Sequence, residues 1–132
     1  MSETKKILVI DDEMDTVVYL TTLLEDNGYQ TVSATDGQVG MEKVKTEKPD
    51  LVVLDMSMPQ KSGMGFYREL KANPDLAKIP VIFVTGVTGF AGDKEGIKKF
   101  IEGRHNIASP EGYFSKPIDR NEFLKAVANL FT

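Results

Sequence analysis

The chain has 132 residues, 41% of them hydrophobic and 27% charged, which suits one soluble domain with a core of its own. Its formal net charge of -4 argues against nucleic acid as a direct ligand, and the absence of cysteine excludes disulfides and thiolate metal sites. No apolar run is long enough to span a bilayer, and the first residues are too short and polar a stretch for a signal peptide, so we expect a cytoplasmic protein without membrane insertion.

The first predicted strand is the apolar run at residues 7–10, and a helix follows from Met14 to a C-cap at Asn27-Gly28. Three acids with no spacer separate the strand from the helix: Asp11, Asp12 and Glu13. The helix dipole favours acids at this position, which is one explanation of the cluster.

A second strand is expected over residues 29–34, followed by a helix that Gly40 weakens by about 1 kcal/mol relative to alanine. In the central strand, an apolar run that starts at Leu51 ends in one acid, Asp55. Such a short run predicts a strand buried on both faces, as in a parallel sheet. Asp55 then lies at the carboxyl end of that strand, where open α/β sheets place their ligands, although aspartate is also common in turns.

The second half of the chain continues the alternation of strands and helices. We expect a helix over residues 64–72, a strand over 81–84 ending in Thr85, a helix over 93–101, a strand over 112–115 and a last helix after the capping-box pair Asp119 and Glu122. The whole pattern predicts a three-layer α/β fold, with helices on both faces of a five-stranded parallel sheet. Because the carboxyl ends of parallel strands meet at one edge, five polar residues should converge there: Asp11, Asp12, Asp55, Thr85 and Lys116.

The residues expected at this edge indicate phosphate chemistry. Three carboxylates would repel one another unless a cation joined them, and Mg²⁺ prefers oxygen ligands of this kind. A carboxylate beside Mg²⁺ can attack phosphorus and form an aspartyl phosphate, while lysine and threonine hold phosphoryl oxygens. Each residue alone has a plainer explanation: Thr85 can simply end a strand, Lys116 can be solvated, and Tyr113 can be a half-buried edge aromatic. Their joint position at several strand ends favours a shared site.

Four motifs resemble those of a known family. They are Val-Ile-Asp-Asp-Glu at 9–13, Leu-Asp-Met-Ser-Met-Pro at 54–59 with Gly63, Pro-Val-Ile-Phe-Val-Thr-Gly at 80–86, and Gly-Tyr-Phe-Ser-Lys-Pro at 112–117. With these motifs the chain is similar, from residue 5 to residue 131, to the receiver domains of two-component signalling, the CheY-like response regulators. The resemblance implies a flavodoxin-like (βα)5 fold with strand order 2-1-3-4-5. It also implies a single receiver domain over residues 1–132 with no output domain.

The resemblance assigns a role to each residue at the predicted site. Asp55 would accept a phosphoryl group from a histidine kinase or a histidine phosphotransfer protein, so the chain would be a phosphoacceptor that takes part in its own phosphorylation and dephosphorylation, not an enzyme. The Mg²⁺ ligands would be Asp11, Asp12, Asp55 and the main-chain carbonyl of Ser57. Lys116 would bind the phosphoryl group. Thr85 and Tyr113 would be the switch pair that alters a partner-binding surface around the fourth helix, fifth strand and fifth helix.

The spacing of two motifs departs from the family pattern. From Thr85 to Lys116 is 31 positions, which is longer than in compact family members, and the excess falls within residues 86–112. Family members use this face to dimerise or to contact targets. The sequence therefore does not identify the downstream target, the oligomeric state or the cognate kinase. It also does not indicate whether phosphorylation activates or inhibits the target.

Two other classes of protein share parts of the pattern. A haloacid-dehalogenase-like phosphatase also uses Mg²⁺ and an aspartyl phosphate, but it needs a second aspartate two positions after the nucleophile, where this chain has Glu13 after Asp11. It would also need room for a cap domain. A flavin-binding electron carrier needs a phosphate-cradling loop after the first strand, and three acids there would repel phosphate. Both alternatives rank well below the receiver domain.

Overall fold

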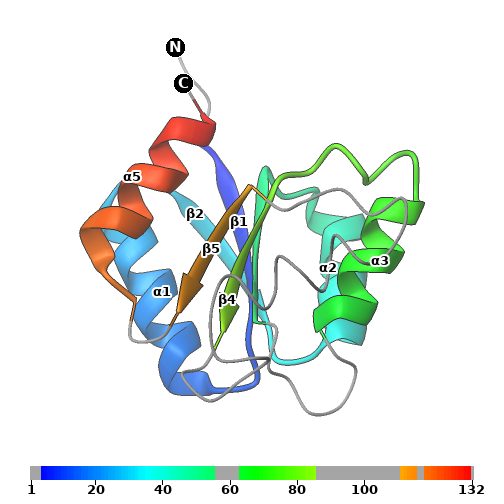
Figure 1. The fold of residues 1–132 in the computed structure, drawn as a ribbon, viewed down its shortest axis with the longest axis horizontal. Coiled ribbons are helices and arrows are strands. Elements are labelled where there is room, and N and C mark those ends of the chain that lie inside the picture. Colours follow the sequence, from blue (N-terminus) through cyan, green and yellow to red (C-terminus); the bar gives the residue numbers. More distant parts are fainter. Residues whose placement is uncertain (1–3, 56–62, 86–110, 116–117, 132) are drawn as a thin grey trace.

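The computed structural model describes residues 4–55, 63–85, 111–115 and 118–131. In chain order its elements are β1 (Lys6–Ile10), α1 (Met14–Asp26), β2 (Gln30–Ala34), α2 (Gly37–Glu47), β3 (Leu51–Asp55), α3 (Gly63–Ala72), β4 (Val81–Thr85), β5 (Gly112–Ser115) and α5 (Arg120–Leu130) (Figure 1). The strands form one five-stranded parallel sheet in the order β2-β1-β3-β4-β5, which confirms the predicted fold and topology. The helix expected over residues 93–101 lies outside the described residues.

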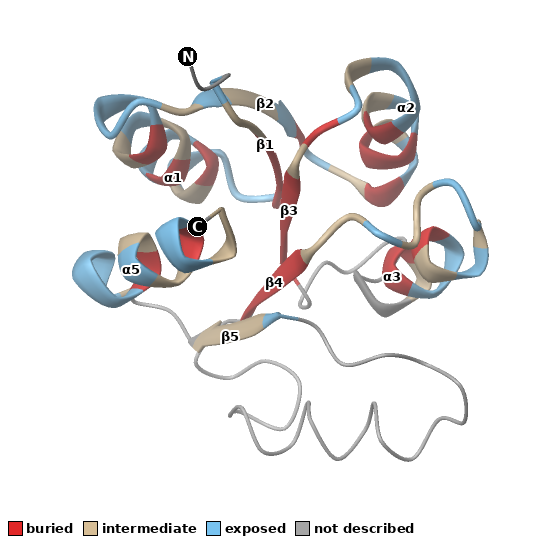
Figure 2. Cartoon of the chain, turned by 90° about the horizontal axis from the view of Figure 1, so that it is seen from above, coloured by how far each residue is buried: buried red, intermediate tan, exposed pale blue. Residues whose placement is uncertain are grey.

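Helices cover both faces of the sheet. Figure 2 shows α1 and α5 on one face and α2 and α3 on the other. Successive residues of the inner strands point to opposite faces, so Ile7 and Val9 pack with α1 and α5, while Leu8 and Ile10 pack with α2 and α3. Every residue of β3 is buried, as expected for a central strand covered on both sides.

The register of the sheet determines which residues meet at its carboxyl edge. Ile10 of β1 is paired with Leu54 of β3, so the next residues, Asp11 and Asp55, lie side by side at the strand ends. On the other side of β3, Asp55 is paired with Val84 of β4. The Asp55 carboxylate therefore lies at the centre of the carboxyl edge, and the Asp11 carboxylate lies next to it.

The helix boundaries follow local sequence signals. Gly28, just after α1, has a φ of 91°, a conformation that glycine adopts without the steric cost of a Cβ. The Asp119 side chain accepts a hydrogen bond from the Glu122 N–H at 3.0 Å, which confirms the predicted cap of α5. The Asp36 side chain accepts from the Val39 N–H at 2.8 Å in the same way and starts α2. Within the described part of the chain, no helix combines the length and apolar character needed to cross a membrane.

Candidate functional site

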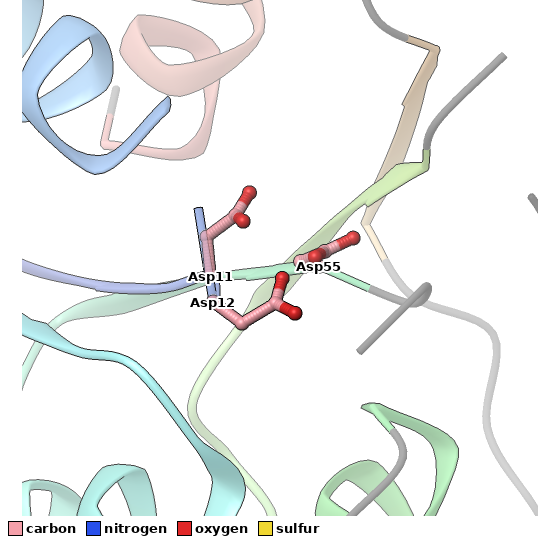
Figure 3. Close-up of side chains that lie close together, drawn as sticks. All are labelled: Asp11, Asp12 and Asp55. Atoms are coloured by element: carbon pink, nitrogen blue, oxygen red, sulfur yellow. The ribbon is translucent and has the colours of Figure 1, made fainter. Parts of the chain in front are cut away.

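Three carboxylates from two strand ends lie together at the carboxyl edge of the sheet. Asp11, Asp12 and Asp55 each offer one oxygen atom, and these oxygens all lie within 4.8 Å of one another. Figure 3 shows the side chains at the neighbouring ends of β1 and β3. Asp11 and Asp55 are each only 1% exposed, whereas Asp12 is exposed to solvent. The predicted convergence of these acids is thus present in the structure.

The backbone around Asp11 holds this residue in a fixed position. Its N–H donates to the Ala34 carbonyl at 3.1 Å, which continues the pairing of β1 with β2 by one residue. Its Oδ1 accepts a hydrogen bond from the Glu13 N–H at 2.9 Å, which turns the chain into α1. Local turn formation therefore accounts for one oxygen of Asp11. It does not account for the approach of Asp12 and Asp55, so the simpler explanation of an acidic helix start is incomplete.

The surroundings of Asp12 raise the pKa of its carboxyl group. Partial desolvation raises the pKa of Asp12 above its usual value, and the negative charge of Asp55 and a side-chain hydrogen bond with Asp55 raise it further. The charge of Glu13 acts in the same direction, while a hydrogen bond with the backbone opposes the shift. A cation bound among the three oxygens would remove this repulsion, and clustered carboxylate oxygens match the ligand preference of Mg²⁺.

The structure describes the other predicted site residues to different extents. Thr85 is the last residue of β4 and is paired with Ser115 of β5, so its backbone lies at the carboxyl edge, but its side chain is outside the described part. Tyr113 lies on β5, is half-buried, and has a buried hydroxyl oxygen. Ser57 and Lys116 lie outside the described residues, so their predicted roles stay predictions.

Sequence reasoning missed the surroundings of Tyr113. Its ring packs edge-to-face on Phe83, with centroids 5.8 Å apart, and Phe83 in turn packs edge-to-face on Tyr67 of α3 at 4.8 Å. Tyr67 and Leu70 are three positions apart, a spacing by which one buried face of the helix predicted over residues 64–72 could have been recognised. No local signal could indicate which strand residue that face would meet, because the contact joins distant parts of the chain.

A parallel sheet of this strand order, with its acidic cluster at the carboxyl edge, places the chain in the flavodoxin-like class of α/β proteins. The family model described as the response regulator receiver domain matches residues 7–128. The chain therefore belongs to the receiver domain family of two-component signalling. This finding confirms the resemblance seen in the four sequence motifs.

Individual relatives support the same assignment. The chain is 34% identical over 122 residues to the protein PilH of Pseudomonas aeruginosa, and the match covers 92% of this chain and 93% of PilH. A response regulator receiver domain from Clostridium thermocellum is 30% identical in sequence, with a TM-score of 0.77 and coverage of 96% and 93% of the two chains. The chemotaxis protein CheY4 of Vibrio cholerae superposes with a TM-score of 0.83 at 20% identity, covering 97% and 99%, which shows the shared fold.

Proposed function

We propose that this chain is a phosphorylation-dependent signalling switch that accepts a phosphoryl group on Asp55. The observation that carries the proposal is the cluster of three carboxylates that includes Asp55, a residue that is 1% exposed and lies at the end of the central strand. The donor is a phosphohistidine of a histidine kinase or of a histidine phosphotransfer protein. The transfer takes place in the cytoplasm, as the sequence led us to expect.

The transfer step needs a nucleophile and a leaving group. A carboxylate oxygen of Asp55 attacks phosphorus while the bond between phosphorus and the donor imidazole nitrogen breaks. The electron pair of that bond stays on the imidazole nitrogen, which then takes up a proton. The product is an acyl phosphate on Asp55, and later attack by water on phosphorus releases phosphate and restores the carboxylate. The buried strand end holds Asp55 still during both steps.

The residues around Asp55 fit a single bound Mg²⁺. Asp11, Asp12 and Asp55 would hold the ion together with the main-chain carbonyl of Ser57, since all four are hard oxygen donors. When bound, the ion neutralises negative charge on the transferring phosphoryl group. The chain itself contributes the fixed position of Asp11, which its hydrogen bond with the Glu13 N–H orients. Lys116 would bind a phosphoryl oxygen.

Exposed apolar residues on α1 suit the approach of a phosphodonor protein. Met14, Val18 and Tyr19 are 57%, 56% and 45% exposed, although most residues of this type are buried in folded proteins. They lie on the helix that begins directly after the acidic cluster. Val18 and Tyr19 also line a pocket of about 320 Å³ together with Arg120 of α5. A donor helix packed there would bring its phosphohistidine to the carboxyl edge of the sheet.

The response to phosphorylation is carried by Thr85 and Tyr113. A phosphoryl group adds charge and strong acceptor oxygens at the sheet edge, so the Thr85 hydroxyl moves toward it to donate a hydrogen bond. Tyr113 then turns into the space behind Thr85, and this changes the partner-binding surface around residues 86–112, β5 and α5. The switch is a two-state element biased by a local change of charge.

Phosphorylation by a small donor tests the proposal. The protein is incubated with Mg²⁺ and acetyl phosphate, and one phosphoryl adduct per chain is expected by mass spectrometry. Asp55→Asn should give no adduct, because the amide is a poor nucleophile of nearly the same shape. The matched control is Asp15→Asn, which removes one exposed acid of α1 outside the cluster and should be phosphorylated normally. An adduct on Asp55→Asn at the wild-type level would assign the acceptor elsewhere, and steady hydrolysis of phosphomonoesters would support a phosphatase.

A further inference from the structure

A series of three aromatic rings runs from β5 across β4 to α3. The rings of Tyr113 and Phe83 meet at 88°, with centroids 5.8 Å apart, and those of Phe83 and Tyr67 meet at 82° and 4.8 Å. Phe83 and Tyr67 have no exposed surface, and Tyr113 packs against the core cluster that contains both. Protein interiors are close-packed, so a ring in this series cannot change its orientation without a response from the next ring.

Lys71 extends the series from Tyr67 to the connection between α3 and β4. Its Nζ lies 5.5 Å from the centroid of the Tyr67 ring, one helical turn away, where an ammonium group is attracted to the ring face. The same Nζ donates hydrogen bonds to the carbonyls of Ala77 and Ile79, each at 3.0 Å. One ammonium group therefore contacts the last ring of the series and two backbone carbonyls of the connection.

Glu111 brings an acidic charge close to this group of residues. Its carboxylate accepts a hydrogen bond from the Val81 N–H at 2.7 Å, and its own N–H donates to the Val81 carbonyl at 2.8 Å, which ties the start of β5 to the start of β4. Burial lowers the pKa of Lys71, and the charge of Glu111 opposes this shift. Burial raises the pKa of Tyr67, and electrostatic interactions with Glu111 and Tyr113 raise it further. These side chains thus share one electrostatic environment.

The connection between α3 and β4, which the Lys71 ammonium contacts, forms one wall of a pocket. This pocket has a volume of about 550 Å³ and lies between the end of α2 and the connection that Lys71 holds. Leu76 and Ile79 line it from the connection, and Val44 and Pro49 line it from the side of α2 and β3. The pocket lies at the amino edge of the sheet, opposite the acidic cluster. A change at the cluster can therefore alter the shape of the pocket only through the residues that lie between them.

We propose that Phe83 and Tyr67 are positioning residues for Tyr113 and that, with Lys71, they couple its orientation to the pocket between α2 and the connection from α3 to β4. The inference rests on the proposed function, in which phosphorylation of Asp55 turns the Tyr113 ring. When that ring turns, its contact with Phe83 changes, Tyr67 repacks, and Lys71 shifts relative to the Ala77 and Ile79 carbonyls. Because coupling between sites is reciprocal, a molecule that fills the pocket would in turn bias Tyr113.

Nuclear magnetic resonance of the ¹⁵N-labelled protein tests the inference with Mg²⁺ and beryllofluoride, which mimics the phosphoryl group. The ¹⁹F signal of bound beryllofluoride reports occupancy of Asp55, and the amide signals of Ala77 and Ile79 report the connection. In the wild type, occupancy should shift both amide signals. In Phe83→Leu and in Lys71→Met we expect the same ¹⁹F signal but amide shifts reduced to roughly half or less. Lys71→Met keeps an apolar stem, so it provides the test if Phe83→Leu does not fold.

The matched control is Phe114→Leu. Phe114 also lies on β5 and packs edge-to-face on a ring, but that ring is Phe123 of α5, on the opposite face of the sheet. This variant loses a comparable aromatic contact and should retain the wild-type shifts of Ala77 and Ile79. The inference is overturned if beryllofluoride binds without shifting these amides, if the shifts persist in both test variants, or if the control loses them equally. Failure of beryllofluoride to bind the wild type would instead overturn the proposed function, and the inference with it.

Discussion

The side chain of Ile10 occupies the space that a Cβ at Gly40 would need. An ideal Cβ on Gly40 would lie 2.6 Å from Cδ1 and 3.2 Å from Cγ1 of Ile10, both closer than real Cβ atoms normally approach a neighbour. Ile10 has no exposed surface and ends β1, directly before Asp11 of the acidic cluster. Glycine thus lets α2 pack closely on β1, the strand that directly precedes two of the three acids.

We expect Gly40→Ala to destabilise the domain by about 1 kcal/mol, although alanine is the better helix former. The helix gains about 1 kcal/mol from the substitution. Overpacking a buried site costs about 1–3 kcal/mol, and the fully buried Ile10 can move its Cδ1 only against close-packed neighbours. The free energy of unfolding in urea measures the net effect.

A second substitution shows whether this contact is the cause. Ile10→Val removes the Cδ1 methyl, so Gly40→Ala should cost less in that background than in the wild type. If the two substitutions were simply additive, the loss of stability would have another origin. Comparison of the two single variants with the double variant thus separates the packing requirement at Gly40 from the effect of alanine on helix stability.

Removal of one acid from the cluster should have opposite effects on Mg²⁺ binding and on stability without metal. Asp12→Asn removes a predicted ligand, and we expect Mg²⁺ affinity to fall by at least about tenfold, since loss of outer-shell partners alone often costs that much. Calorimetric titration measures the affinity. Without metal, the variant should be more stable than the wild type, because the Asp12 carboxylate no longer faces Asp55. Asp15→Asn, which leaves the cluster intact, should change Mg²⁺ affinity very little.

The gain in stability from Asp12→Asn should depend on pH. The pKa of Asp12 is raised in the folded protein, so the folded state binds a proton more readily than the unfolded state. The metal-free wild type therefore gains stability from this residue as pH falls through the raised pKa, and loses it as pH rises. At low pH a protonated Asp12 resembles asparagine, so the difference between wild type and variant should shrink. Urea unfolding with a chelator measures the difference in free energy of unfolding, from neutral pH down to about pH 4, where an ordinary aspartate titrates. A difference that stays constant over this range would contradict the charge of Asp12 as its cause.

The strands and the acidic cluster were predictable because they depend on short-range patterns. Each central strand is a short apolar run, and the alternation of elements predicts parallel strands, so the residue pattern placed Asp11 and Asp55 at the same edge of the sheet. That β1 lies next to β3 was implied by the resemblance to receiver domains, and the sheet confirms it. The packing at Gly40 was not predictable, since the sequence showed only a poor helix former. The contact of Phe83 with Tyr67 was also hidden, because periodicity indicates which face is buried but not what it meets.

A last prediction concerns Lys48, the C-cap residue that directly follows α2. Its backbone has a φ of 51° and a ψ of 60°, and its N–H donates to the Val44 carbonyl, so it caps the helix in the left-handed conformation. A residue with a Cβ pays about 1–2 kcal/mol for this conformation, whereas glycine adopts it freely but gains more entropy on unfolding. We expect Lys48→Gly to stabilise the domain by about 0.5–1 kcal/mol in urea unfolding.

The matched control for Lys48→Gly is the same substitution one turn earlier. Lys45 lies in the last turn of α2, so Lys45→Gly should cost about 1 kcal/mol in helix propensity. Stabilisation by both substitutions would contradict relief of backbone strain as the cause, because Lys45 lies within the helix and has no such strain to relieve. Lys48 precedes β3 and Asp55 ends it, so phosphorylation of Lys48→Gly by acetyl phosphate should proceed at the wild-type rate. Lost phosphorylation in that variant would show that the end of α2 influences the acidic cluster across the length of the central strand.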